Sequence, residues 1–370
     1  MNTEPKALFH VPEKDHYFLT HSIGLMPKSA QAYLSNTYLE PWKSGAEDIW
    51  PQWLSAIEDF NGALASLLNS NSEQFCPQAN VSSGLAKLIQ SLPPKAGRTV
   101  ILATQSDFPS AGFVLQQAER LGFTIRYIPD GQDLQSIDVW SKALTDDVYC
   151  AFVTHVHYNT NTLTPVADIT ELCRARGIVS IMDIAQSVGV VPIDLQALSV
   201  DVIVGSCIKW LCGGPGAGYL WLREELVQQL NPIDVGWFSH QNPFEFDINN
   251  FDYADSAARF WGGTPSVASY IVASNSIKLI SSIGVENIRD HNRRLCAKVI
   301  NGVPEECVAS PLDLSKKGGT LVLKFANSAK VEQKLRDKNV LFDARQYGIR
   351  LSPHVYTNEQ DIDVLLDCLS

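Results

Sequence analysis

The sequence lacks the features that mark membrane, secreted and nucleic-acid-binding proteins. None of its apolar runs is long enough to span a bilayer, and residues 1–6 contain no apolar signal core. The net charge of −11 leaves no basic excess with which to hold nucleic acid or an anionic membrane. We therefore expect a cytoplasmic protein that binds neither nucleic acid nor membrane.

The cysteines, histidines and glycines of the sequence also lack the spacing of the motifs that are common for these residue types. The eight cysteines include no C-x-x-C pair, and Cys150 and Cys207 lie in apolar runs, which predicts buried free thiols. The eight histidines have no metal-ligand spacing, so we expect no metal site. The glycine-rich segment 213–218 lacks the G-x-G-x-x-G spacing and precedes a strand-like run, so it is not a dinucleotide-binding loop.

What the sequence does contain is a regular alternation of strand-like and helix-like segments. This alternation predicts an α/β fold, in which a mostly parallel sheet is covered on both faces. The predicted strands are residues 99–102, 124–128, 148–154, 178–182 and 201–205, and the predicted helices include residues 46–68, 85–92 and 168–176.

The pattern changes after residue 250. Two long helices are predicted over 266–283 and 285–300, followed by a half-buried strand at 320–325, a helix at 331–338 and a strand at 348–352. This order is typical of a smaller α+β unit. We therefore predict an N-terminal arm (1–45) that joins a small C-terminal domain (251–370), and a large domain between them (46–250).

Two chemically distinct side chains follow neighbouring strands. Asp183 ends the run 178–182, and Lys209 follows the run 201–205. In open α/β sheets, ligands bind just beyond the carboxyl ends of the strands. Taken singly, such residues are usually turn formers or solvated loop residues. Together they favour pyridoxal phosphate, whose aldehyde needs a lysine and whose ring nitrogen needs a carboxylate.

Four further residues fit the same cofactor, each with an ordinary alternative. Ser82 and Ser83 precede a predicted helix, where a phosphate could bind, although serine is also a common N-cap. Phe108 follows the strand at 99–102 and could stack on the cofactor ring, or it could belong to the core. Gln186 could donate a hydrogen bond to the ring oxygen, although glutamine is common in a first helical turn.

Arg350 lies in an apolar strand, where a guanidinium needs an anionic partner. A substrate carboxylate held in a bidentate fork is one such partner. An internal ion pair with a residue such as Asp343 is the other. The sequence leaves both open.

With these residues in view, the chain resembles the kynureninases, within the class V aminotransferase group of fold-type I pyridoxal phosphate enzymes. The resemblance extends from about residue 18 to residue 356. It depends on the order of several short segments: 21–28, 108–110, 183–189, 209–211, 214–216, 236–238, 263–265 and 349–353.

The resemblance implies a role for each matching residue. Lys209 would be the Schiff-base lysine, Asp183 would face the pyridinium nitrogen, and Phe108 would stack on the ring. A homodimer with a shared active site is also implied. The remaining implied contacts are Gln186 with the cofactor; Ser82, Ser83, Trp237 and Thr264 with the phosphate, Thr264 coming from a second subunit; and Arg350 and Ser22 with the substrate.

Three positions depart from the usual kynureninase pattern. Ala111, Gln186 and Ile208 stand where Asp, His and Tyr are usual in that family. The leading hypothesis is therefore a kynureninase-like hydrolase that cleaves a Cβ–Cγ bond of an amino acid other than kynurenine. An aminotransferase is the second hypothesis and a cysteine desulfurase-like lyase the third. A catalytically idle binding protein is opposed by the presence of Lys209, Asp183 and Arg350.

Overall fold

The computed structural model describes residues 4–45, 48–93 and 95–369. Its centre is a seven-stranded sheet with the order β2-β8-β7-β6-β5-β3-β4. The five strands from β7 to β4 are parallel, while β8 runs antiparallel to both β7 and β2. The strands are β2 (Phe75–Gln78), β3 (Val100–Thr104), β4 (Thr124–Ile128), β5 (Val148–Thr154), β6 (Val179–Asp183), β7 (Val202–Ser206) and β8 (Gly218–Leu222). The predicted α/β fold with a mostly parallel sheet is confirmed.

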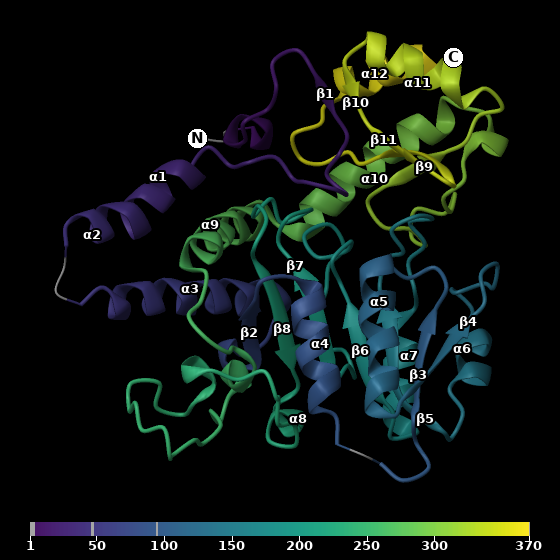
Figure 1. The fold of residues 1–370 in the computed structure, drawn as a ribbon. Coiled ribbons are helices and arrows are strands. Elements are labelled where there is room, and N and C mark those ends of the chain that lie inside the picture. Colours follow the sequence, from purple (N-terminus) through teal and green to yellow (C-terminus); the bar gives the residue numbers. More distant parts are fainter. Residues whose placement is uncertain (1–3, 46–47, 94, 370) are drawn as a thin grey trace.

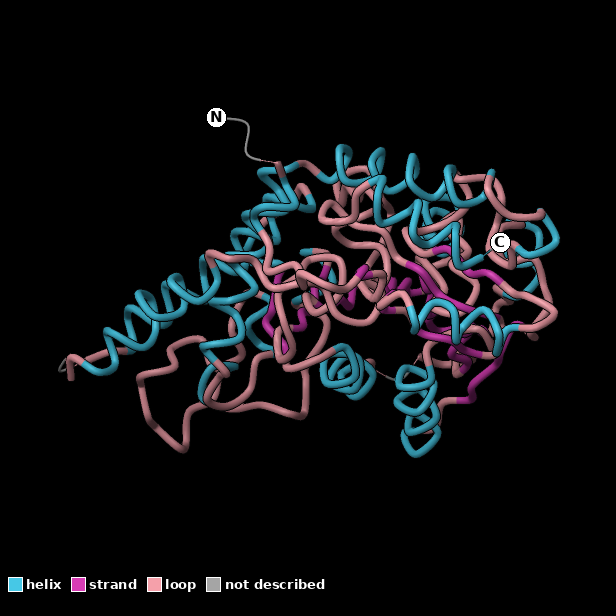
Figure 2. Tube along the Cα trace, turned by 90° about the horizontal axis from the view of Figure 1, so that it is seen from above, coloured by secondary structure: helices cyan, strands magenta, loops and turns pink. Residues whose placement is uncertain are grey.

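Helices cover both faces of this sheet (Figures 1 and 2). Alternate strand residues point to opposite faces, so Leu102 belongs to one core while Ile101 and Ala103 belong to the other. The first core also takes in α3 (Trp50–Leu68), α6 (Ile137–Ala143), α7 (Val166–Ala175) and α9 (Val267–Ile283). The second takes in α4 (Val81–Ser91), α5 (Pro109–Gln117) and α8 (Glu224–Val227).

A third core lies in the last third of the chain and includes Phe18 from the N-terminal segment. Its antiparallel sheet has the order β11 (Asp343–Arg345), β12 (Gly348–Leu351), β9 (Leu321–Leu323). Residues from α10 (Val285–Asn301), α11 (Ser328–Asp337) and α12 (Glu359–Leu369) complete it. The N-terminal segment joins this region through β1 (His16–Tyr17), which pairs with β10 (Val340–Leu341). The proposed domain limits remain predictions.

Two helix starts differ from the sequence prediction by four residues. The helix predicted over 46–68 begins at Trp50, and residues 46–47 lie outside the described residues. The helix predicted from 85 begins four residues earlier, at Val81, because the Asn80 side chain caps it by accepting the Ser83 backbone N–H at 2.9 Å. Two short helices, α1 (Ala30–Leu34) and α2 (Glu40–Lys43), precede α3. Within the described ranges, no helix combines the length and the apolar character that crossing a membrane requires.

Candidate active site

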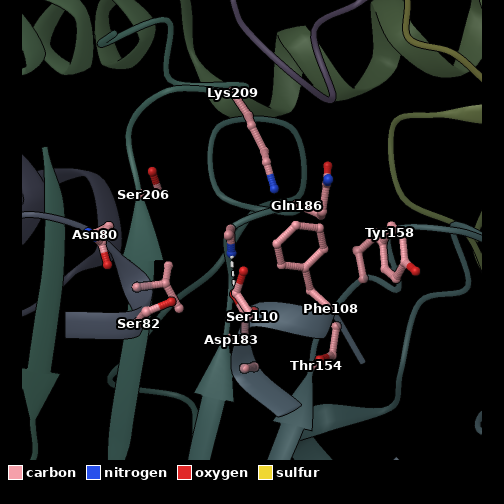
Figure 3. A pocket seen from close by; sticks show the side chains of 14 residues that line it. Asn80, Ser82, Phe108, Ser110, Thr154, Tyr158, Asp183, Gln186, Ser206 and Lys209 are labelled. Atoms are coloured by element: carbon pink, nitrogen blue, oxygen red, sulfur yellow. Dashed lines mark hydrogen bonds between the residues drawn. The ribbon is translucent and has the colours of Figure 1, made fainter. Parts of the chain in front are cut away.

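A cavity of about 450 Å³ lies at the carboxyl ends of β5, β6 and β7 (Figure 3). Thr154, Asp183 and Ser206, the last residues of these three strands, line it. The N-terminal ends of α4 and α5 contribute Ser82 and Ser110. Its size is within the range of pockets that bind small molecules and cofactors. The strand-end rule therefore places this cavity where the sequence predicted a site.

Lys209 follows β7 and extends into the cavity (Figure 3). Its Nζ atom lies 5.6 Å from the centre of the Phe108 ring and makes no hydrogen bond or ion pair with the described part of the chain. Burial lowers the pKa of Lys209 to about 8, against the opposing charge of Asp183. The unprotonated amine, which is the form that attacks a carbonyl, is therefore more abundant near neutral pH than for an ordinary lysine.

Asp183 ends β6 and lies directly opposite Thr154 in the parallel ladder. It is buried, and its Oδ1 atom accepts the Ala185 backbone N–H at 2.8 Å. Burial raises the pKa of the Asp183 carboxyl, while the Ala185 hydrogen bond and the charge of Lys209 oppose the rise. A carboxylate held in this way is stabilised by a cationic N–H group, such as a protonated pyridine ring, on the same cavity wall.

The start of α4 forms one end of the cavity. Asn80 and Ser82 line it, but Ser83 does not, because both its N–H and its hydroxyl donate to the Asn80 side chain. The first N–H groups of a helix have no intrahelical acceptor and bind anions such as phosphate. Gly218 of β8 packs against this turn, since a Cβ there would lie 2.8 Å from the Asn80 Cα. The glycine-rich segment thus has a packing role beside the helix start.

Aromatic and amide groups complete the cavity. Phe108 is 45% exposed, and its ring meets the Tyr158 ring edge to face at 5.2 Å. Gln186 donates to the His21 carbonyl at 3.1 Å, whereas its buried Oε1 atom has no hydrogen-bond partner among the described residues. Because an unpaired buried oxygen is costly, a polar ligand is expected beside it. Together with Lys209 and Asp183, this unpaired oxygen makes the cavity fit a cofactor with several polar groups.

The three positions that depart from the kynureninase pattern lie in different surroundings. Ala111 and Gln186 both line the cavity. Ile208 does not, and its carbonyl accepts the Gly24 N–H at 2.8 Å.

Besides Ser83 and Arg350, three predicted contacts lie outside the cavity lining of this single chain. Thr264 and Ser22 are exposed, and Trp237 is half-buried and packs edge-on against Trp50 at 5.2 Å. His21, next to Ser22, is the buried residue of that pair. The predicted roles of Thr264, Trp237 and Ser22 remain predictions.

Arg350 forms the internal ion pair that was the alternative to substrate binding. Its Nε and Nη2 atoms donate to the two carboxylate oxygens of Asp343, both at 2.7 Å, and Nη1 donates to the Tyr158 carbonyl at 2.9 Å. Its side chain is 6% exposed, so the guanidinium requires this neutralisation. The bidentate edge expected to face a substrate carboxylate is therefore taken by Asp343.

Sequence reasoning missed five polar residues that line the cavity: Asn80, Ser110, Thr154, Tyr158 and Ser206. Thr154 and Ser206 end strands, so the rule that found Asp183 could have found them too. Asn80 carries an N-cap signal, being a strong capping residue before an apolar run. Tyr158 gives no comparable signal, because an irregular segment after β5 brings it there.

Comparisons with known proteins agree with this site. The sequence model of the family "Aminotransferase class-V" matches residues 28–365. An uncharacterized aminotransferase of Bacillus subtilis, YcbU, is 27% identical over 321 residues, covering 86% of this chain and 84% of that protein. A kynureninase of Bacillus anthracis is 28% identical over 367 residues, covering 93% and 85%.

Solved structures show the same fold. A variant of the enzyme C-DES, with glycine covalently linked to its pyridoxal phosphate, has a TM-score of 0.88 at 21% identity and covers 98% of both chains. A cysteine desulfurase of Thermococcus onnurineus has a TM-score of 0.84 at 20% identity, covering 95% of this chain and 92% of that one. The predicted fold-type I architecture is confirmed. The chain therefore belongs to the class V aminotransferase family and is an enzyme whose cofactor is pyridoxal 5'-phosphate.

Proposed function

We propose that this pyridoxal phosphate enzyme is a kynureninase-like hydrolase that cleaves a Cβ–Cγ bond in an α-amino acid. The observation that supports the site is the half-buried Lys209 amine, which shares one cavity with the buried Asp183 carboxylate and makes no hydrogen bond or ion pair with the described residues. The kynureninase relatives, which cover the chain almost completely, support the choice of reaction.

Each part of the cavity has a role in this proposal. Lys209 would hold the aldehyde end of the cofactor, and Asp183 would keep a proton on its ring nitrogen. The start of α4, with Ser82, would hold the phosphate, and Phe108 would lie against the ring. When bound, the cofactor supplies an aldehyde that reacts with amines and a protonated ring that withdraws electrons. Once released, the Lys209 Nζ atom would carry the proton taken from the substrate's α-carbon.

The cofactor assignment has a direct test. Purified holoenzyme should be yellow, and borohydride reduction should fix the cofactor on Lys209, as peptide mass analysis would show. Lys209→Ala should lose the label. Lys278→Ala is a matched control, because Lys278 also lies over an aromatic ring but is exposed. Label on another lysine would remove Lys209 from this role.

The reaction needs a separate assay. Holoenzyme is incubated with kynurenine and with 3-hydroxykynurenine, and alanine and the anthranilate product are measured. Because Ala111, Gln186 and Ile208 replace ionisable groups, we expect weak turnover of both compounds and faster hydrolysis of another amino acid. One positioned acid or base contributes about 10²–10⁴-fold in rate. Efficient alanine release would show that these three replacements matter little.

Transamination is the second candidate, supported by the aminotransferase YcbU among the relatives. It requires the same lysine and aspartate but no activated water. Conversion of an amino donor to its keto acid, without cleavage of its side chain, would favour it over hydrolysis. No cysteine of the described residues lines the cavity, so nothing in the site favours a desulfurase.

A further inference from the structure

Arg350 and Asp343 form a cross-strand pair that is fixed by the small sheet. They are direct partners in the antiparallel register of β11 and β12, so their side chains leave the sheet on the same face. Both contacts between the guanidinium and the carboxylate are 2.7 Å long. This pairing holds the guanidinium plane in one orientation.

The pair leaves part of the guanidinium unused. A guanidinium has five N–H donors, of which Asp343 takes two and the Tyr158 carbonyl takes one. The other two have no acceptor among the described residues. The Arg350 Cζ atom lies 6.0 Å from the centre of the Tyr158 ring, and Tyr158 lines the cavity that holds Lys209. Tyr158 therefore contacts the guanidinium through its carbonyl and also lines the cavity that holds Lys209.

The charges around Asp343 leave room for one more anion. Arg345 reaches the same carboxylate, with its Nε atom 3.2 Å from Oδ2. His21 Nε2 lies 3.7 Å from Oδ1, but burial lowers the pKa of His21 and keeps its ring neutral. Two arginines against one aspartate give this cluster a net charge of plus one. A single carboxylate would neutralise it, whereas two would not be balanced.

We propose that Asp343 is a positioning residue that presents the two unused N–H groups of Arg350 to one substrate carboxylate. The proposal rests on the proposed function, since that carboxylate belongs to the α-amino acid bound near Lys209. Substrate binding and the internal ion pair are then compatible, because they use different edges of one guanidinium. Binding of a substrate that carries a second carboxylate on the same side is disfavoured, because the cluster has one positive charge to neutralise.

The test compares two amines that differ only in the carboxylate. Holoenzyme is titrated with L-alanine and with ethylamine, and the absorbance of the bound cofactor gives each dissociation constant. A hydrogen bond to a charged group predicts that wild-type protein binds alanine at least about 10-fold more tightly. Asp343→Asn should reduce this ratio several-fold without changing the affinity for ethylamine.

Two further variants keep the test specific. Asp147→Asn breaks an exposed aspartate–arginine pair with Arg126 and should leave the ratio unchanged. Arg350→Lys keeps the positive charge but lacks the planar guanidinium, so it cannot bind Asp343 and a substrate carboxylate at the same time. This variant should lose the preference for alanine. It tests the proposal even if Asp343→Asn folds poorly.

The contrary results are distinct. Tighter binding of alanine by Asp343→Asn would mean that Asp343 competes with the substrate, which overturns the proposal. Equal loss of affinity for both amines, with a lower melting temperature, would mean a purely structural role and would also overturn it. A wild type that binds both amines equally would remove Arg350 from carboxylate binding. If the protein takes up no pyridoxal phosphate, the amine titration cannot be carried out. That result would overturn the proposed function itself.

Discussion

Asp183–Lys209 and Asp343–Arg350 each combine a buried residue with a half-buried one of opposite charge, and they differ in how many hydrogen bonds they make within the chain. Lys209 makes none with the described residues, and Asp183 accepts one from a backbone N–H. Arg350 makes three, and both Asp343 oxygens are used. The pKa values differ accordingly. Burial raises the pKa of Asp183, whereas at Asp343 the effect of burial is outweighed by the paired Arg350 guanidinium and the nearby His21 ring, which lower the pKa.

This difference separates two uses of buried charge. Polar groups that are buried without partners destabilise a fold, so they persist where a ligand completes them. Groups whose bonds are complete hold their neighbours in place. The first pair is therefore expected to control cofactor binding, and the second to control how a substrate is oriented. Mutations can separate the two effects.

The largest effect is expected at Asp183. Asp183→Ala should weaken cofactor binding by about 30-fold or more, because it leaves the ring nitrogen without its anionic partner. Asp343→Asn is the control and should leave cofactor retention unchanged. Dialysis of the holoenzyme, followed by absorbance of the retained cofactor, measures both. If Asp183→Ala retained the cofactor and converted substrate at the wild-type rate, Asp183 would not control cofactor binding, and the contrast between the two pairs would be wrong.

Arg350→Ala comes next. It should raise the KM for an α-amino acid by roughly 10- to 100-fold through the loss of a charged hydrogen bond. Cofactor retention should be that of the wild type. Steady-state kinetics on any amino acid that is turned over gives the answer. An unchanged KM would leave Arg350 with a structural role alone.

Much of the fold was predictable because the large sheet is built from long apolar strands. The predicted ranges 124–128 and 148–154 coincide with β4 and β5. The strands β10 and β11 were missed, because they have two and three residues and no periodicity of their own. They exist through pairing with β1 and β12, which is a tertiary effect.

The site was predictable where a residue's position in the sheet decides its place. Asp183 and Lys209 stand at the carboxyl ends of neighbouring strands, and in an open α/β sheet these ends lie together at the ligand-binding edge. Tyr158 comes from an irregular segment, and its approach to the cavity could not be read from spacing. The partner of Arg350 depends on the β11–β12 register, which sequence alone left undecided.

Lys209 should also affect stability. Its pKa in the fold, about 8, is below the ordinary value of 10.5, so the charged amine destabilises the fold at pH values below about 8. That penalty is relieved as the pH rises from about 8 to 10.5. Lys209→Met should therefore raise the unfolding free energy of cofactor-free protein by about 1–3 kcal/mol at pH 7, and less at pH 10.

Urea denaturation at several pH values measures this difference. Lys278→Met is the control, since Lys278 is exposed and paired with Asp59. Its effect should be small. A gain for Lys209→Met that is constant with pH would reflect added apolar burial and not the removal of a charge.

The smallest effects are expected at the start of α4, where two neighbouring side chains repeat the contrast. Asn80 lines the cavity, but its side chain already accepts two hydrogen bonds from Ser83. Asn80→Ala should therefore lower stability by about 1 kcal/mol, the usual cost of losing an N-cap, while Asn80→Asp keeps the cap. Ser82 also lines the cavity, and its hydroxyl makes no hydrogen bond within the described ranges. Ser82→Ala should weaken cofactor binding several-fold and leave the melting temperature unchanged. If Ser82→Ala affected only stability, an unpaired polar group at this site would not mark a ligand contact.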